Sequence, residues 1–507
     1  MRSNMKHLIT LLAVTFSLHA AINDPVRTDS GMVQGIAGTN PDITVFKGLP
    51  FAAPPVGELR WRAPKPVAPW NGVRKADAFG PMCMQAAGRG GTVPKMSEDC
   101  LYLNVWTAAK SSSEKRPVLL WIHPGGYTSG SGSSPATDGE ALAKKGVVVV
   151  TINYRLGSLG FFSHPELTKE SDRNASGNYA LMDQTAALEW VQKNIAGFGG
   201  DPKRVTVDGD SAGAASIGNL VASPRTKGLF QRAIAESGAW LGLSVSHMNT
   251  LAEAEQNGAK AGSLADLRAK PADEILKIRG GGPVIDGWFL PEDPGKVFAE
   301  GRQNDIPVLL GSNKDEGTFF AQPTTAAKYV EGIHRRYADL ALADQYLKIY
   351  PGATDEEAND SQLRAFRDEL GWVMRNWASL QSKTGKSKAY LYYFTHEPPQ
   401  GNAASPRGGR GSGATHGAEA AYVFENLLPP RPWTDLDREV ADTLSSYWVN
   451  FATSGNPNGK GLPEWPAFDK KSSDRRMVLG DKAALGPGLE KPQVDFYQTK
   501  YDKRDQR

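Results

Sequence analysis

Short, continuous apolar runs, separated by stretches of helical periodicity, are the feature that most limits how this chain can fold. The runs that we predict to be strands lie at 117–123 (PVLLWIH), 147–152 (VVVVTI), 205–207, 307–310 and 390–394 (YLYYF). Apolar residues that are continuous rather than alternating are typical of strands buried on both faces, as in a parallel sheet. We therefore predict an α/β protein whose large, mostly parallel central sheet carries helices on both faces.

The remaining segments predict one large domain. Residues 178–195 place apolar side chains at helical spacing, and residues 321–388 are expected to be largely helical and to form a cap over a site. Residues 400–415 are rich in Gly, Ser and Pro and predict an exposed loop. Because no clear linker divides the rest of the chain, we predict a single domain over 22–507.

Residues 1–21 predict a secretory signal peptide. Arg2 and Lys6 precede an apolar run at 8–18, and residues 19–21 (HAA) offer small residues for cleavage. The alternative, a buried first helix, fits poorly with the charged flank. The run is too short to span a bilayer, no later segment reaches spanning length, and no cysteine follows to carry a lipid. We expect a secreted or periplasmic protein without a membrane anchor.

The charge balance argues against a nucleic-acid partner. The 507 residues include 58 Lys and Arg against 55 Asp and Glu, a formal net charge of only +3. A protein that binds nucleic acid through its phosphates usually carries a marked basic excess. The sequence therefore gives no reason to expect such a partner.

Cys83 and Cys100 are the only two cysteines of the chain. In an oxidising compartment they predict one short-range disulfide, and two free buried thiols are the alternative. Two cysteines alone do not make a tetrahedral zinc site, and we expect no metal.

The segment 209–213 (GDSAG) matches the pattern G-x-S-x-G. The pattern alone is weak because glycine is abundant, but here the predicted strand at 205–207 precedes it and a predicted helix at 212–221 follows. A sharp strand-to-helix turn needs glycines beside the serine and presents the hydroxyl at the helix N-terminus, where an anion is favoured. Ser211 is therefore the candidate nucleophile, with a purely structural turn as the alternative.

Two glycines predict a site for a negatively charged oxygen. Gly125 and Gly126 follow the predicted strand at 117–123 after Pro124, which has no N–H to donate. Together with the N–H of Ala212, these two N–H groups could hold the oxygen of a tetrahedral intermediate. A plain glycine turn is the alternative.

A serine nucleophile requires a base, and the base requires a carboxylate that orients it. His416 lies in a loop beyond the predicted strand at 390–394, where such folds place a catalytic histidine. Asp315 and Glu316 both follow the predicted strand at 307–310, and the residues alone do not choose between them. The chain order of serine, acid and histidine is that of the α/β-hydrolases.

Further motifs occur in a fixed order along the chain: 45–52 (VFKGLPFA), 54–57 (PPVG), 97–105 (SEDCLYLNV), 153–157 (NYRLG) and 198–202 (FGGDP). In this combination the chain resembles the type-B carboxylesterase family, which includes the cholinesterases. The resemblance extends to about Trp465. It implies an α/β-hydrolase fold and the hydrolysis of small-molecule carboxylic esters without a cofactor.

The resemblance also implies roles for single residues. It makes Ser211 the nucleophile, selects Glu316 over Asp315 as the acid, and makes His416 the base. For the aromatic residues Trp240, Phe319 and Phe320, which it matches to substrate-contacting positions, plain core packing is the alternative. The other matched positions are the oxyanion donors (Gly125, Gly126 and Ala212), the first disulfide (Cys83 and Cys100), a structural ion pair (Arg155 and Asp183), and the acyl pocket and gorge (Trp240, Phe319 and Phe320).

The chain departs from the family pattern at three places. Asp210 stands where members usually have Glu, and Pro124 stands at the usual first glycine of the oxyanion loop. The loop between Cys83 and Cys100 contains no Trp. The tryptophan that cholinesterases use against a quaternary ammonium therefore has no counterpart, and choline esters are not expected substrates.

We predict a serine esterase that works through an acyl-enzyme. An amidase or thioesterase with the same triad is one alternative. The other is a non-catalytic binding protein, although such members of the family typically lack the nucleophile. Arg407 and Arg410, near His416 in sequence, would allow an anionic substrate edge. The sequence does not predict the oligomeric state.

Overall fold

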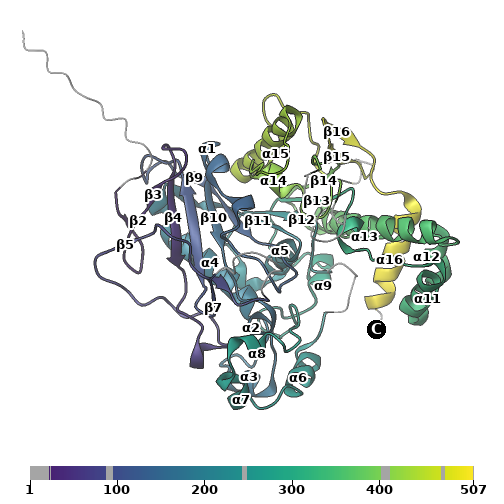
Figure 1. Cartoon of the computed structure of the whole chain (residues 1–507), viewed down its shortest axis with the longest axis horizontal. Coiled ribbons are helices and arrows are strands. Elements are labelled where there is room, and N and C mark those ends of the chain that lie inside the picture. The colour runs from purple at the N-terminus through teal and green to yellow at the C-terminus, as the bar shows by residue number, and fades with distance from the viewer. Residues whose placement is uncertain are drawn as a thin grey trace, which may run out of the picture.

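The computed structural model describes residues 22, 24–86, 95–241, 248–400, 412–469 and 474–505 (Figure 1). The predicted signal peptide at 1–21 and the basic residues Arg407 and Arg410 lie outside these residues.

The centre of the molecule is a sheet of eleven strands in the order β16-β15-β14-β13-β12-β11-β9-β10-β8-β4-β3 (Figure 1). All neighbours from β10 to β15 in this order are parallel, and the outer pairs at both edges are antiparallel. Its strands are β3 (Ile36–Ala37), β4 (Thr44–Pro50), β8 (Tyr102–Thr107), β9 (Arg116–Ile122), β10 (Val148–Ile152), β11 (Gly200–Asp210), β12 (Arg232–Glu236), β13 (Val308–Asn313), β14 (Ala389–Phe394), β15 (Arg476–Leu479) and β16 (Ala483–Gly486).

Two small sheets accompany the large one. Strands β1 (Val26–Arg27), β2 (Met32–Gln34) and β5 (Val73–Lys75) form the first, and β6 (Met82–Cys83) pairs with β7 (Met96–Ser97) in the second.

The continuous apolar runs are explained by burial on both faces of the sheet. In β9, Val118 and Leu120 point into one hydrophobic core, whereas Leu119 and Trp121 between them point into a second. All five predicted runs coincide with strands of the large sheet, and three of them extend one residue beyond the strand. The predicted fold class is confirmed, because each face of this mostly parallel sheet is covered by helices.

The helices fall on the two faces and at two ends of the molecule (Figure 1). Apolar residues of α4, α5, α9 and α13 belong to the first core, and those of α1, α14 and α15 belong to the second. The described helices are α1 (Glu140–Lys144), α2 (Gly157–Gly160), α3 (Pro165–Glu170), α4 (Tyr179–Asn194), α5 (Ala212–Ala222), α6 (Leu251–Ala259), α7 (Leu264–Ala269), α8 (Ala272–Ile275), α9 (Pro294–Ala299), α10 (Gly317–Phe320), α11 (Ala326–Tyr337), α12 (Ala343–Ile349), α13 (Asp355–Thr384), α14 (Ala420–Val423), α15 (Asp435–Ser454) and α16 (Lys491–Asp505).

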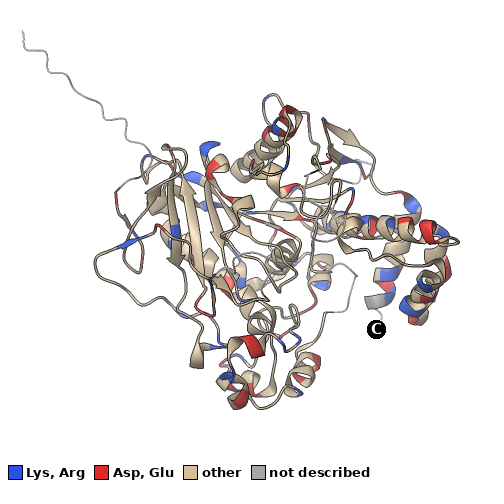
Figure 2. Ribbon diagram, viewed as in Figure 1, with Lys and Arg blue, Asp and Glu red and all other residues tan. Residues whose placement is uncertain are grey.

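The helices predicted at 178–195, 212–221 and 321–388 are present as α4, α5 and the set α11, α12 and α13. None of the described helices combines the length and apolar character needed to cross a membrane. Figure 2 shows Lys and Arg interspersed with Asp and Glu along the surface helices, in keeping with the small net charge.

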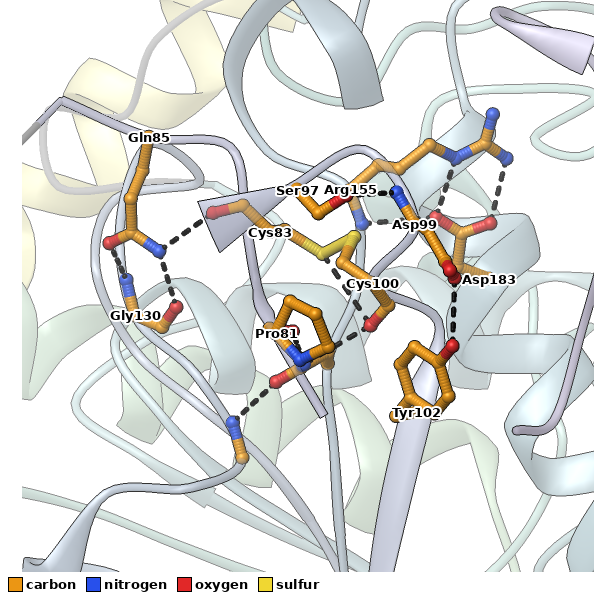
Figure 3. The surroundings of a disulfide bond; sticks show 12 residues. Pro81, Cys83, Gln85, Ser97, Asp99, Cys100, Tyr102, Gly130, Arg155 and Asp183 are labelled. Atoms are coloured by element: carbon orange, nitrogen blue, oxygen red, sulfur yellow. Dashed lines mark hydrogen bonds and ion pairs between the residues drawn. A yellow bond between two sulfur atoms is a disulfide. The ribbon is translucent and has the colours of Figure 1, made fainter. Parts of the chain in front are cut away.

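The predicted disulfide is confirmed: Cys83 and Cys100 are bonded, with their Cα atoms 4.9 Å apart. Figure 3 shows that Gln85 connects this bridge to the loop after β9. The Nε2 atom of Gln85 donates to the carbonyl of Cys83 at 3.1 Å and to that of Gly130 at 2.9 Å, and its Oε1 accepts from the N–H of Gly130 at 2.9 Å. The disulfide therefore supports the loop that contains Gly125 and Gly126.

The predicted ion pair of Arg155 and Asp183 is also confirmed (Figure 3). Two nitrogens of the guanidinium lie 2.7 and 2.8 Å from the two oxygens of Asp183, and the backbone N–H of Arg155 donates to the same carboxylate at 3.0 Å. Both side chains are buried, so the bidentate geometry compensates for their desolvation. The pair fixes the segment after β10 to α4.

Candidate active site

The candidate residues gather at one edge of the sheet because they follow neighbouring parallel strands. The glycine turn follows β9, Ser211 follows β11, Glu316 follows β13, and the loop of His416 comes after β14. The carboxyl ends of parallel strands meet at one edge, which is where open α/β sheets bind ligands.

Ser211 occupies a strained turn between β11 and α5. Its φ and ψ are 56° and −115°, a conformation that a residue with a side chain rarely adopts. A Cβ on Gly209 would lie 2.7 Å from the carbonyl oxygen of Ile122, and one on Gly213 would lie 2.0 Å from the same atom. The two glycines of the motif are therefore required by the close approach of the turn to β9.

The turn holds the serine in place and leaves it accessible. The N–H of Ser211 donates to the carbonyl of Glu236 at the end of β12, at 2.8 Å. Ser211 is partly exposed, whereas Asp210 and Ala212 on either side are buried. The hydroxyl is thus presented to solvent at the first turn of α5.

The turn after β9 presents unpaired donors. Gly125 and Gly126 have φ values of +121° and +60°, and a Cβ on Gly125 would lie 2.0 Å from the carbonyl oxygen of Ser129. In the part of the chain that the structure describes, no acceptor takes the N–H groups of Gly125, Gly126 or Ala212. Ala212 is buried, Gly125 is partly exposed and Gly126 is exposed, so the three N–H groups line an accessible site and are available to a ligand oxygen.

His416 is held by a carboxylate from another strand. Its Nδ1 atom lies 2.6 Å from Oε2 of Glu316, which is fully buried. The other oxygen of Glu316 accepts from the hydroxyl of Ser237 at 2.6 Å and from the N–H of Asn313 at 2.9 Å. These contacts fix both the orientation and the tautomer of the imidazole.

Asp315 has a different partner. Its carboxylate accepts from the N–H of Ala414 at 2.9 Å, and its own N–H donates to the carbonyl of Ala414 at 2.9 Å. A Cβ on Gly413 would meet the same carboxylate at 2.3 Å. Asp315 therefore holds the backbone of the loop that carries His416, while Glu316 holds its ring.

The other ring nitrogen of His416 is available. Nε2 is buried and has no hydrogen-bond partner among the described residues. Burial lowers the pKa of His416, but the charges of Glu316 and Asp210 and the hydrogen bond to Glu316 together raise it to about 9. The environment thus stabilises a positively charged imidazole.

Asp210, beside Ser211, lies against the loop that carries His416. Its Oδ2 lies 2.9 Å from the position of a Cβ on Gly417, the residue after His416, whose φ is +73°. Burial raises the pKa of Asp210 to about 6, while the charge of His416 lowers it and that of Glu316 raises it. Contact at this point leaves room only for glycine at position 417.

Glu419 extends the group of buried carboxyls behind the histidine. It accepts hydrogen bonds from the hydroxyl of Tyr392 at 3.1 Å and from the side-chain amide of Asn313. Burial, followed by the charges of Asp210 and Glu316, raises its pKa to about 8. The environment of Glu419 therefore favours its protonated form.

Asp208 and Glu236 form a second buried acidic pair on adjacent strands. Trp448 of α15 donates its indole N–H to one oxygen of Glu236 at 2.8 Å. Neither oxygen of Asp208 finds a donor among the described residues, and burial raises the pKa of both carboxyls well above their ordinary values. Neighbouring carboxyls can bond to each other only if one is protonated, so we infer that the pair holds a proton.

The aromatic candidates occupy two different environments. The rings of Phe319 and Phe320 lie 5.4 and 4.8 Å from that of His416, and both are partly exposed. Trp240 is only 6% exposed and stacks on Phe298 at 4.2 Å, against the ring of Trp377. The structure therefore places the two phenylalanines at the site and Trp240 within the core.

Sequence reasoning missed the residues that support the triad candidates. Ser237 and Glu419 emerge only from their contacts, although Ser237 directly follows a strand and Glu419 lies three positions after His416. Asp208 carries a sequence signal, since it is an acid inside the apolar strand at 205–210.

The fold, with a nucleophile turn between strand and helix at the carboxyl edge of the sheet, defines an α/β-hydrolase. The model of the "Carboxylesterase family" matches residues 23–497. The chain therefore belongs to the carboxylesterase family and is a carboxylic ester hydrolase of the serine type, as its resemblance predicted.

Individual relatives agree with this assignment. The chain is 38% identical to the fumonisin B1 esterase of Sphingopyxis macrogoltabida, over 94% of this chain and 91% of that enzyme. It is 35% identical to the para-nitrobenzyl esterase of Bacillus subtilis (strain 168), over 93% of this chain and 98% of that enzyme. A solved structure of PNB esterase superimposes with a TM-score of 0.79 at 32% identity, covering 94% of this chain and 99% of that one.

Proposed function

We propose that the protein hydrolyses carboxylic esters in two acyl-transfer steps with Ser211 as the nucleophile. His416 takes the proton of the Ser211 hydroxyl as the oxygen attacks the ester carbonyl. The same histidine then gives this proton to the oxygen of the leaving alcohol, and the acyl group stays on the serine. In the second step His416 activates a water molecule, which releases the acid and restores the serine.

Each step of this mechanism depends on particular residues around Ser211. Glu316 keeps the Nδ1 proton of His416 in place, so that Nε2 faces the nucleophile as a base and the imidazolium is stabilised when it forms. The N–H groups of Gly125, Gly126 and Ala212 stabilise the oxyanion, and losing one such donor costs about 3 kcal/mol in the barrier. Phe319 and Phe320 supply an apolar wall beside the histidine. We propose substrate contact for these two residues, with Trp240 packed behind the site.

The observation that carries the proposal is that Nε2 of His416 has no hydrogen-bond partner among the described residues, while Glu316 orients the ring in the same site as a serine on a strained turn. This arrangement has no use in a protein that only binds, and maintaining the strain at Ser211 costs roughly 1–3 kcal/mol. A binding protein would gain stability by relaxing it.

The test is mass spectrometry of the intact protein after treatment with an organophosphonate ester, followed by peptide mapping. We expect one adduct, on Ser211, and none on a Ser211→Ala protein. Ester hydrolysis by a clean Ser211→Ala preparation, or an adduct on another residue, would contradict the proposed nucleophile. Matched ester, amide and thioester substrates of one acid then rank the leaving groups.

We also propose that the protein is exported and that residues 1–21 are removed, since the charged start and short apolar run are typical of a signal peptide. The intact mass of protein recovered from the periplasm or the medium of the expressing cells tests this. A mass that still includes residues 1–21 would contradict it.

A further inference from the structure

A cavity of about 770 Å³ opens between α6 and the segment at 278–284, at the end of the molecule where α2, α3 and α6 gather (Figure 1). Phe161 and Ser163 form part of one wall, and Asn257 and Lys260 form part of another. Arg279 and the three glycines that follow it complete the lining. The volume is within the range of cavities that bind small molecules.

The cavity adjoins the turn that offers the oxyanion donors. Tyr127 directly follows Gly126, and its ring packs against that of Phe161 with the centroids 4.8 Å apart. On the cavity side, a Cβ on Gly282 would lie 3.8 Å from the same tyrosine ring. Phe161, which lines the cavity, therefore contacts the side chain next to the oxyanion turn, and a side chain at position 282 would contact it as well.

The glycines keep this space open. A Cβ on Gly280 would lie 2.5 Å from the N–H nitrogen of Ser158, so no side chain fits there. Gly281 and Gly282 have room for one, since their nearest neighbours would be 4.0 and 3.8 Å away. Because neither carries a side chain, nothing at these positions fills the space between Arg279 and Tyr127.

Lys260 and Arg279 are the charged side chains in the described lining of the cavity, and both are cationic. Lys260 donates to the side chain of Asn257 at 3.0 Å, and among the described residues Arg279 makes no hydrogen bond or ion pair. No Asp or Glu is found in the described lining. The nearby carboxylate of Glu253 accepts from the N–H of Thr250 at 2.8 Å, in the capping box of α6. A guanidinium and an ammonium group that line one cavity, with no carboxylate in its described lining, attract a carboxylate ligand.

We propose that this cavity is a subsite for a free carboxylate, so that the preferred substrates are esters whose acyl part carries a second carboxylate. The inference rests on the proposed function. His416 protonates the leaving alcohol, which places the alcohol beside Phe319 and Phe320. The carbonyl oxygen sits at the glycine turn, so the acyl chain extends away from the histidine, toward Tyr127 and the cavity.

The test compares two substrates of equal chain length: the mono-4-nitrophenyl ester of adipic acid and 4-nitrophenyl hexanoate. In the Arg279→Ala protein we expect the ratio of KM for the half-ester to KM for the neutral ester to rise about tenfold, since a hydrogen bond to a charged group is lost at an exposed position. Arg279→Lys keeps a charge and should recover part of the difference. Lys260→Ala should act in the same direction.

Arg336→Ala is the matched control, because it removes an exposed arginine from a different cavity, between α11 and α13. This variant should leave the ratio as in the wild type. An equal effect of Arg279→Ala on both esters, or no effect on either, would overturn the proposal. A change of the same size in Arg336→Ala would also overturn it, because the effect would then be general electrostatics.

A binding measurement separates this proposal from the proposed function. Adipate, added to the Ser211→Ala protein, should raise its Tm, and the rise should be lost in the Ser211→Ala/Arg279→Ala protein. If the wild type hydrolyses neither the half-ester nor the hexanoate ester but adipate still raises the Tm through Arg279, the proposed function fails and the subsite stands. If hexanoate is hydrolysed and adipate has no effect on the Tm, the subsite fails alone.

Discussion

In the folded chain, Nδ1 of His416 lies 2.6 Å from Oε2 of Glu316, although the two residues are 100 positions apart in sequence. The neighbouring carboxylate of Asp315 turns away and binds the backbone of Ala414. The two adjacent acids thus have different roles: Glu316 orients the imidazole, and Asp315 holds the loop that carries it.

This division can be tested by neutralising each acid in turn. Glu316→Gln should lower kcat by about 10³- to 10⁴-fold, because the amide favours the wrong tautomer of His416 and no longer stabilises the imidazolium. Asp315→Asn is the matched control, since an amide oxygen can still accept from Ala414, and we expect only a few-fold loss. Steady-state kinetics with a 4-nitrophenyl ester measure both. Similar losses in the two variants would contradict the assignment of Glu316.

The pH dependence of kcat/KM should depend on Asp210. Burial lowers the pKa of His416, but the negative charges of Glu316 and Asp210 raise it to about 9. A general base must be neutral, so activity should rise as the pH rises through this pKa. Asp210→Asn removes one negative charge above pH 6, where Asp210 is ionised, and the pKa of His416 should fall.

The acid limb of the kcat/KM profile of Asp210→Asn should therefore lie at lower pH than that of the wild type. Asp210→Glu restores the charge and is expected to move the limb back. Profiles of kcat/KM measured from pH 5 to 10 for the wild type and the two variants test this prediction. An acid limb at the same pH in all three proteins would show that Asp210 does not act on His416.

The disulfide should stabilise the fold and the oxyanion turn together. Replacing both cysteines by serine opens a loop with a sequence separation of 17 and should lower the free energy of unfolding by about 3 kcal/mol. Urea unfolding of the two proteins under non-reducing conditions measures this. Because Gln85 connects Cys83 to Gly130, kcat should also fall in the variant, even at temperatures where it is folded. Unchanged stability would contradict the prediction.

The buried acid Asp208 should reduce stability at high pH. Its pKa is raised by burial, so the folded chain keeps a proton that the unfolded chain releases above about pH 4. The folded state then binds more protons than the unfolded state, and the free energy of unfolding falls as the pH rises above that value, by up to about 1.4 kcal/mol per pH unit. Asp208→Asn removes the carboxyl that binds this proton, so it no longer contributes to the difference in bound protons between the folded and unfolded states.

Urea unfolding of Asp208→Asn at pH 5, 7 and 9 should show a weaker fall of stability with pH than the wild type. The gain over the wild type should be greatest at pH 9. Asp172→Asn, on the surface beside Arg173, is the control and should follow the wild-type profile. Equal slopes in all three proteins would mean that Asp208 is ionised in the folded state.

Local order along the chain accounts for what could be predicted without coordinates. The run at 147–152 predicts a strand because its valines are apolar on both faces of a covered sheet, and the glycines at 209 and 213 predict a tight turn at Ser211 because a side chain would collide there. The signals for β10 and for the nucleophile depend on residues adjacent in sequence. The local structure of each such segment can therefore be predicted from the residues of that segment alone.

The choice between Asp315 and Glu316 could not be made in this way. From the residues alone the two acids are equivalent, and only a family resemblance favoured Glu316. The structure separates them because the end of β13 turns one side chain toward His416 and the other toward Ala414. That direction depends on the backbone of two loops that pack together.

The sequence by itself determined the class of sheet, the position of the nucleophile turn, and the two cysteines available for a disulfide. Only the tertiary structure decided that Asp208 lies beside Glu236 with no donor among the described residues, that Trp240 belongs to the core, and that Arg279 lines a cavity near Tyr127. Strand and turn signals come from neighbouring residues. Burial, pKa and the charge of a cavity are set by residues that only packing brings together.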